Sequence, residues 1–192
     1  MKQTVRFGLV LLITTAIAGG ILAYANSITA PIIAEREKAG SFGAFQEIFT
    51  EADDFVVLDD ALLSEMTSAN AGIQEVYEAK SGEEILGYAF KTASTGFGGD
   101  IITISGFNLD GTIAGIKVIQ NSETPGLGSR VVDDPAYADS YVGKSSAAEL
   151  VVVESPSADN EVLLLSGATV SSKGVLAGVN GAREAFVNFL SN

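Results

Sequence analysis

The longest uncharged stretch of the sequence lies near its N-terminus, where no charged side chain occurs between Phe7 and Ala34. A helix rises about 1.5 Å per residue, so roughly 20 apolar residues cross the hydrocarbon core of a bilayer. Lys2 and Arg6 precede the run, and the positive-inside rule then keeps the N-terminus in the cytoplasm. We therefore expect residues 1–34 to form a cytoplasmic stub and one transmembrane helix of the cell membrane, with the rest of the chain exported.

Two other interpretations of this segment are open. A cleaved signal peptide also begins with basic residues, and the sequence AYA at Ala23–Ala25 has the small-x-small form of a cleavage site. A pilin-like filament helix would carry an early glutamate, whereas the first acidic residue here is Glu35, which disfavours this interpretation. Both the membrane anchor and the signal peptide place everything after about residue 26 outside the cytoplasm.

Composition excludes several kinds of chemistry. The chain has neither cysteine nor histidine, which rules out disulfides, thiolate or imidazole metal sites, thiol nucleophiles and histidine-based triads. Its formal charge of −13 repels the phosphate backbone of nucleic acids. We therefore expect no nucleic-acid partner and no metal site. The pairs Asp53-Asp54 and Asp59-Asp60 are interpreted as a solvated acidic face, because no loop of oxygen ligands surrounds them.

The exported part divides into two segments. Residues 35–70 are expected to form a stalk that continues the helix after a break near Pro31, weakened by Gly40 and Gly43, and then a less regular acidic stretch. Residues 71–192 are expected to form one globular domain, which is long enough to bury a core of its own.

Strand signals dominate the middle of this domain. Four segments rich in Ile, Val, Tyr, Phe and Thr, with turn residues between them, predict an antiparallel meander. A loop with several Gly and Pro residues, a further strand near residues 148–155 and a helix with an apolar stripe follow. Clustered strands with flanking helices indicate an α+β fold. The meander is expected at 72–79, 83–93, 100–109 and 112–121, and the helical stripe at Val175, Val179, Ala182, Phe186 and Phe189.

The sequence SGATVSS, Ser166–Ser172, stands between the apolar run EVLLL and this last helix. A helix that starts near Val170 leaves its first backbone N–H groups without intrahelical partners, and serine or threonine commonly caps them. The same N–H groups and the positive end of the helix dipole also hold phosphate, with Gly167 and Ala168 allowing close approach of the backbone. A threonine hydroxyl in this position could also be esterified by that phosphate. Both interpretations are open from these residues alone.

A second motif, SETPGLGSR at Ser122–Arg130, follows the meander. Its proline fixes one φ angle, and Gly126 and Gly128 permit positive φ, so we expect a rigid turn that pushes Leu127 outward as a lone apolar side chain. An ordinary surface turn would contain the same residues. A third glycine-rich stretch, TGFGGDI at Thr95–Ile101, precedes a strand and is equally ambiguous.

The motifs ETPGLG and SGATVSS in this order, with a C-terminal amphipathic helix and one N-terminal membrane helix, resemble the FMN-binding domain family. The resemblance covers nearly the whole chain. In layout the chain is most similar to the G subunit of the Rnf electron-transport complex. The C subunit of the sodium-translocating NADH:quinone reductase is similar but more distant.

The resemblance implies a covalent flavin. In this family the threonine of the SGAT motif carries FMN through a phosphoester that a flavin transferase installs after export, which assigns the attachment to Thr169. The chain departs from the family at Leu163, where the transferase's preferred sequence often has an acidic residue; Asp159 lies further upstream. The family's ETPGLG loop lies against the flavin. The implied cofactor-binding residues are therefore Ser166, Gly167, Ala168, Ser171 and Ser172 in the first motif, and Glu123, Thr124, Gly126, Leu127 and Gly128 in the second.

The function implied by the resemblance is electron relay, because FMN exchanges single electrons. The chain is expected to connect redox centres of neighbouring subunits in a membrane complex that couples electron transfer between ferredoxin and NAD to sodium or proton movement. It would be a redox component of this oxidoreductase that contributes no catalytic acid–base residue, and not a complete enzyme. Two redox alternatives are a component of the quinone-reducing relative and a stand-alone extracellular flavin carrier. The alternative from another class is a non-redox, membrane-tethered binding module in which SGATVSS only caps a helix.

Overall fold

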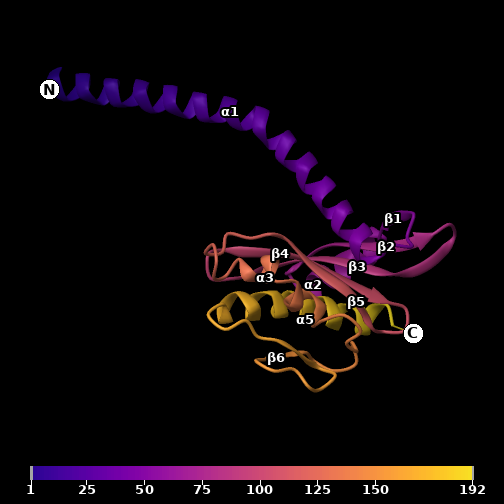
Figure 1. Cartoon of the computed structure of the whole chain (residues 1–192). Coiled ribbons are helices and arrows are strands. Elements are labelled where there is room, and N and C mark those ends of the chain that lie inside the picture. Colours follow the sequence, from indigo (N-terminus) through magenta and orange to yellow (C-terminus); the bar gives the residue numbers. More distant parts are fainter. Residues whose placement is uncertain (1, 192) are drawn as a thin grey trace. The chain divides into compact units, whose positions relative to one another are not determined.

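The computed structural model describes residues 2–191 (Figure 1). The chain divides into two units, one up to Gly40 and one from Ser41 onward. The first unit consists of the N-terminal part of helix α1, Lys2–Ile48, which runs through Pro31 without interruption. The expected break near Pro31 is therefore not observed, because a proline removes one hydrogen bond of the helix while the bonds on either side remain. Within α1, residues Val5–Pro31 have a mean hydropathy of 2.1 and are long enough to cross a membrane.

The centre of the second unit is a five-stranded antiparallel sheet in the order β1-β2-β3-β4-β5. The four strands expected from the sequence are present, which together with the helices confirms the α+β class. Strand β1 is additional, since its four residues were too short to stand out in an acidic context. The strands are β1 Asp54–Val57, β2 Ile73–Ser81, β3 Glu84–Thr95, β4 Asp100–Asn108 and β5 Ile113–Gln120.

Residues 50–70 are more regular than expected, because they hold β1 and helix α2, Asp60–Ala69. The acidic residues of this stretch are exposed, as predicted, and two of them also organise the backbone. Asp59 is the N-cap of α2 and accepts a hydrogen bond from the Ala61 N–H at 2.9 Å. The Asp53 carboxylate accepts the N–H of Gly82 in the β2–β3 turn at 3.1 Å.

Both faces of the sheet are covered by apolar side chains, because residues alternate along each strand. Helix α5, Thr169–Phe189, lies along one face (Figure 1) and packs on Val76, Phe90 and Phe107. The other face packs against the C-terminal turns of α1, with Phe45 among its buried residues. The stripe predicted for the last helix is confirmed: Val175, Val179, Ala182 and Phe186 are buried, and Phe189 is half-buried against the same core.

The long connection between β5 and α5 contains short elements, of which the sequence indicated only the first strand. Two helical turns follow the ETPGLG motif, and the second begins with a proline behind an aspartate N-cap, a common helix start. The strand expected near 148–155 is present but short, and it pairs in parallel with β7. Strand β7 leads directly into the SGATVSS motif. These elements are α3 Arg130–Asp133, α4 Pro135–Asp139, β6 Val151–Val153 and β7 Glu161–Leu163.

Candidate functional site

Three segments that are separate in the sequence, two of them rich in glycine, meet around one pocket of about 300 Å³. They are the loop before β4, the ETPGLG turn after β5 and the first turn of α5. The pocket brings together most of the residues that the resemblance assigned to cofactor binding, whereas Ser166, Ser172 and Gly126 lie outside its lining. The lining residues are Phe97, Glu123, Thr124, Leu127, Gly128, Gly167, Ala168, Thr169, Val170 and Ser171.

Helix α5 begins without a side-chain cap. Its N-cap residue is Ala168, which has no hydroxyl, and no side-chain hydrogen bond caps the helix. Gly167 adopts a φ of +82°, a conformation that favours glycine, and this turn presents Thr169 as the first helical residue with an exposed side chain. The interpretation of SGATVSS as a simple helix cap is therefore wrong. The N–H groups of the first turn, which lack intrahelical acceptors, are left for another partner.

Ser166 and Ser172 do not line the pocket but hold its threonine-bearing turn in place. The Ser166 carbonyl accepts a hydrogen bond from Arg130 Nη1 at 3.1 Å. Ser172 is buried, and its Oγ accepts the Leu165 N–H at 3.3 Å while its carbonyl accepts the Tyr137 hydroxyl at 3.1 Å. The two serines therefore act through the shape of the turn and not through contact with the pocket.

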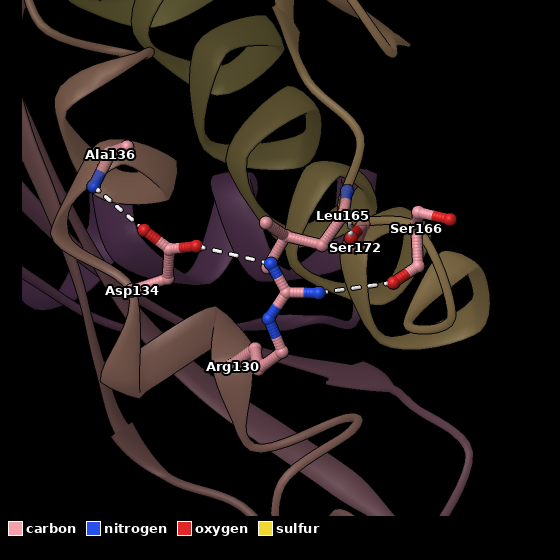
Figure 2. A network of polar contacts seen from close by, with 6 residues as sticks. All are labelled: Arg130, Asp134, Ala136, Leu165, Ser166 and Ser172. Atoms are coloured by element: carbon pink, nitrogen blue, oxygen red, sulfur yellow. Dashed lines mark hydrogen bonds and ion pairs between the residues drawn. The ribbon is translucent and has the colours of Figure 1, made fainter.

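Figure 2 shows how Arg130 joins this turn to the helices that follow ETPGLG. Its guanidinium lies between the Ser166 carbonyl and the carboxylate of Asp134, which it contacts at 3.2 Å. The other oxygen of Asp134 accepts the Ala136 N–H at the start of α4. Arg130 belongs to the second motif, but the sequence offered no indication that it reaches the first, because the contact spans a long separation in the chain.

The ETPGLG segment forms the expected tight turn. The Thr124 carbonyl accepts the N–H groups of Leu127 and Ser129, each at 3.2 Å. Gly126 has a φ of +76° and lies outside the pocket wall, whereas Leu127 is 52% exposed at the pocket, as predicted. Of the two glycines that permit positive φ in this motif, only Gly126 adopts it, and Gly128 does not. Glycine is required there by close approach instead, because a Cβ would come within 2.5 Å of the Glu123 carboxylate.

Glu123 connects all three segments of the pocket. Its Oε1 accepts the N–H groups of Phe97 at 2.8 Å and Gly98 at 3.0 Å, and its Oε2 accepts the Ser171 hydroxyl at 2.5 Å. The side chain is buried, with 6% of the residue exposed. Burial raises the pKa of this carboxyl, but the hydrogen bonds from Ser171, Gly98 and Phe97 outweigh it and hold the pKa below its ordinary value. Glu123 is therefore ionised at neutral pH.

Phe97 and Val170 are pocket residues that sequence reasoning missed. Phe97 is 73% exposed and Val170 is 51% exposed, although both are large and apolar. An aromatic residue within a run of glycines, in TGFGGDI, was the available signal for Phe97, but this stretch had no link to the other motifs until the fold joined them through Glu123.

The donors and surfaces of the pocket suit a phosphorylated ligand with an apolar ring system. The α5 N-terminus offers free N–H groups and a positive dipole end, and its first turn contains no acidic residue. Phe97, Leu127 and Val170 offer apolar surface around the same space. Pockets that hold cofactors commonly combine apolar walls with a few placed polar groups.

Residues 96–184 match the family model of the FMN-binding domain, and this range contains every residue of the pocket. The G subunit of the Na(+)-translocating ferredoxin:NAD(+) oxidoreductase complex of Acetobacterium woodii is 35% identical, over 97% of this chain and 93% of its own length. The G subunit of the proton-translocating ferredoxin:NAD(+) oxidoreductase complex of Clostridium ljungdahlii is 28% identical, over 93% of this chain and 89% of its own.

Solved structures share the fold. The C subunit of the Na(+)-translocating NADH-quinone reductase of Parabacteroides distasonis superposes with a TM-score of 0.58 at 21% identity, covering 73% of this chain and 79% of that one. NqrC of Shewanella oneidensis gives 0.55 at 19%, covering 76% and 85%. Because the relatives in sequence align over nearly their whole length and the FMN-binding model covers the pocket, the chain belongs to the FMN-binding-domain family of G subunits of ion-translocating ferredoxin:NAD(+) oxidoreductase complexes.

Proposed function

We propose that this chain is a membrane-anchored electron-transfer component of an ion-translocating ferredoxin:NAD(+) oxidoreductase complex, and that it carries FMN on Thr169 through a phosphoester. The observation that carries the proposal is the position of Thr169. Its exposed side chain is the first of helix α5, at the pocket that the two motifs form together. The names of the G-subunit relatives and the FMN-binding family model support the same redox role.

The phosphate would be held by the backbone. In the proposed linkage, the Thr169 Oγ is bonded to the flavin phosphorus and has lost its proton, and the added mass is one FMN less one water. The free N–H groups of the first turn of α5 and the helix dipole would stabilise the remaining negative charge. Gly167 and Ala168 bring this backbone to the edge of the pocket without a bulky side chain.

The ring system would be placed by the apolar walls. When bound, FMN supplies the capacity to accept and donate single electrons. Leu127, Phe97 and Val170 offer contact surface and exclude water, and Glu123 holds the three loops in register. We assign cofactor-binding roles to the motif residues and no acid–base role to any side chain, because electron relay needs none.

The anchor and the partners follow from the same proposal. Residues Val5–Pro31 would span the membrane with the N-terminus in the cytoplasm, and residues 71–192, which contain the whole pocket, would form the flavin-binding domain outside it. The electron partners would be redox centres of neighbouring subunits. A flavin transferase would reach Thr169 because the side chain is exposed, and Asp159, also exposed, precedes β7 on the approach to the motif.

The proposal is tested by the intact mass of the full-length protein purified from membranes of a host that has the flavin transferase, combined with in-gel flavin fluorescence after denaturation. We expect the added mass of one FMN less one water, on the peptide that contains Thr169. Thr169→Ala should carry none, whereas Thr124→Ala, which removes the same kind of hydroxyl from the ETPGLG part of the pocket lining, should retain it. A flavin that remains covalently bound in Thr169→Ala would refute the attachment site. The unmodified mass in the wild type would refute the covalent linkage altogether.

A further inference from the structure

Glu123 is the only charged residue that is buried in the part of the chain whose side chains the structure describes. None of the ion pairs found in this part involves it. Its charge is met by neutral donors alone, two backbone N–H groups and one hydroxyl. The pocket wall therefore carries a full negative charge that no neighbouring cation cancels.

The sequence around this carboxylate makes room for it from several sides. A Cβ on Gly96 would lie 2.3 Å from Oε1, and a Cβ on Gly128 would lie 2.5 Å from Oε2. A Cβ on Gly98 would meet the Ser122 carbonyl at 2.0 Å, so this glycine lets the N–H-bearing loop reach the carboxylate. The close packing of the three loops therefore fixes the position of the Glu123 carboxylate and leaves its side chain one rotamer.

The hydrogen bonds of Glu123 do not in themselves require a charge. Both N–H groups point to one oxygen, and the Ser171 hydroxyl points to the other. A glutamine of the same shape would accept the two N–H bonds with its amide oxygen, and its NH₂ group would donate to Ser171 Oγ, because a hydroxyl both donates and accepts. The geometry of the loops and the charge of the pocket can therefore be separated experimentally.

Resting on the function proposed above, we propose that the Glu123 carboxylate is a positioning and electrostatic residue that lowers the reduction potential of the flavin held in this pocket. Each electron that enters the flavin from the reduced centre of a neighbouring protein adds negative charge next to a wall that is already negative. Salt screens exposed charges over roughly 10 Å at 0.1 M, and a buried charge such as that of Glu123 is screened much less. Reduction is therefore disfavoured by Coulomb repulsion.

Glu123 contacts both the first turn of α5 and the loop that carries Phe97. The positive end of the α5 dipole and its free N–H groups lie where the phosphate is proposed to attach, and they act on the phosphate charge. Glu123 lines the same pocket as the apolar side chains of Phe97, Leu127 and Val170. Its field therefore also reaches the ring system proposed to lie against these side chains, where the electron is added.

The test measures the midpoint potential of the flavin by spectroelectrochemical titration of full-length, flavinylated protein, after intact mass has established the flavin load. Glu123→Gln should shift the potential in the positive direction, and the shift should persist at high salt. Asp100→Asn is the matched control. It removes the same charge from an exposed residue directly after the Phe97 loop, and we expect a smaller shift that salt abolishes. Ser171→Ala removes one hydrogen-bond donor but keeps the charge, and it should not shift the potential upward.

Each outcome decides between the proposals. Electrostatic tuning would be overturned if the midpoint potential of Glu123→Gln equalled that of the wild type. It would also be overturned if Ser171→Ala shifted the potential upward by as much as Glu123→Gln, because a change in packing would then explain both shifts. Electrostatic tuning would also be overturned if the wild type carried flavin and Glu123→Gln carried none, since the carboxylate would then be needed for attachment of the flavin. A wild type without flavin would instead refute the proposed function, and tuning with it.

Discussion

Two parts of the pocket wall, the threonine turn at Gly167–Thr169 and the site of the Glu123 carboxylate, differ in their electrostatics. At the threonine turn the helix start has no side-chain cap, and the available groups are backbone N–H donors with the positive end of a dipole. At the Glu123 site a buried carboxylate occupies a space bounded by glycines and accepts hydrogen bonds from the donors around it, the Ser171 hydroxyl of α5 among them. One cavity can therefore combine donors that suit an anion with a wall charge that disfavours added negative charge.

The two parts also differ in how they are held. The threonine turn is fixed from outside the pocket by Arg130 and by the buried Tyr137 and Ser172, while the Thr169 side chain is exposed. The Glu123 site is fixed from within the pocket, because the carboxylate itself joins the loops. Substitutions outside the pocket should therefore affect the threonine turn, and substitutions within it should affect the Glu123 site most strongly.

The largest effect on stability is expected for Gly128→Ala. Its new Cβ would collide with the Glu123 carboxylate and with Ser171 Oγ, and overpacking of this kind costs about 1–3 kcal/mol. Gly126→Ala is the matched control, since its Cβ would meet open space and only the positive φ is strained, at about 1 kcal/mol. Denaturant unfolding of the full-length proteins measures both. An equal loss in the two variants would show that the Glu123 site is not held by close packing.

The next effect is expected for Arg130→Gln. The variant loses the ion pair with Asp134, which is partly exposed and contributes little, about 0.3–0.5 kcal/mol for such a pair. It also weakens the hydrogen bond to the Ser166 carbonyl. We expect nearly unchanged unfolding but slower attachment of FMN, measured as the flavinylated fraction by intact mass over time after induction. Asp134→Asn removes the ion pair but keeps the hydrogen bond from the Arg130 guanidinium to the Ser166 carbonyl. The rate of FMN attachment in this variant should therefore stay closer to that of the wild type.

The ionisation of Glu123 predicts a modest pH dependence. Because its pKa in the folded state is lowered, the stabilising contribution is fully present above the unfolded pKa of about 4.5 and is lost as the pH falls through the lower folded value. The free energy of unfolding of the wild type should therefore fall more steeply below pH 4.5 than that of Glu123→Gln. Parallel curves for the two proteins would contradict the hydrogen-bonded, ionised carboxylate.

The smallest effect on stability is expected for Leu127→Ala, because this side chain is half exposed in the described structure. The variant should retain covalent FMN and unfold like the wild type, but the flavin absorption spectrum should change as its apolar contact is removed. Val132→Ala, an exposed apolar residue of α3 outside the pocket lining, is the control. A spectrum unchanged in Leu127→Ala would remove this residue from the flavin contact surface.

Much of the fold followed from local patterns. The uncharged N-terminal run, the period of two in the meander and the stripe from Val175 to Phe186 each report a property that neighbouring residues share, so they were readable from the sequence. Strand β1 and the short helices α3 and α4 were not, because a few residues in a polar context carry too little periodic signal. The helix through Pro31 was also missed, since the proline's local preference was overridden by the rest of the helix.

The site was readable in part. ETPGLG and SGATVSS were identified as candidate loops, and Thr169 and Leu127 lie at the pocket as the resemblance implied. What only the tertiary structure decided is that TGFGGDI joins them, that Glu123 is the buried charge linking all three, and that Arg130 braces the threonine turn. Local sequence records backbone conformation and solvent preference, whereas a hydrogen bond between residues far apart in the chain exists only once the sheet and α5 have brought them together.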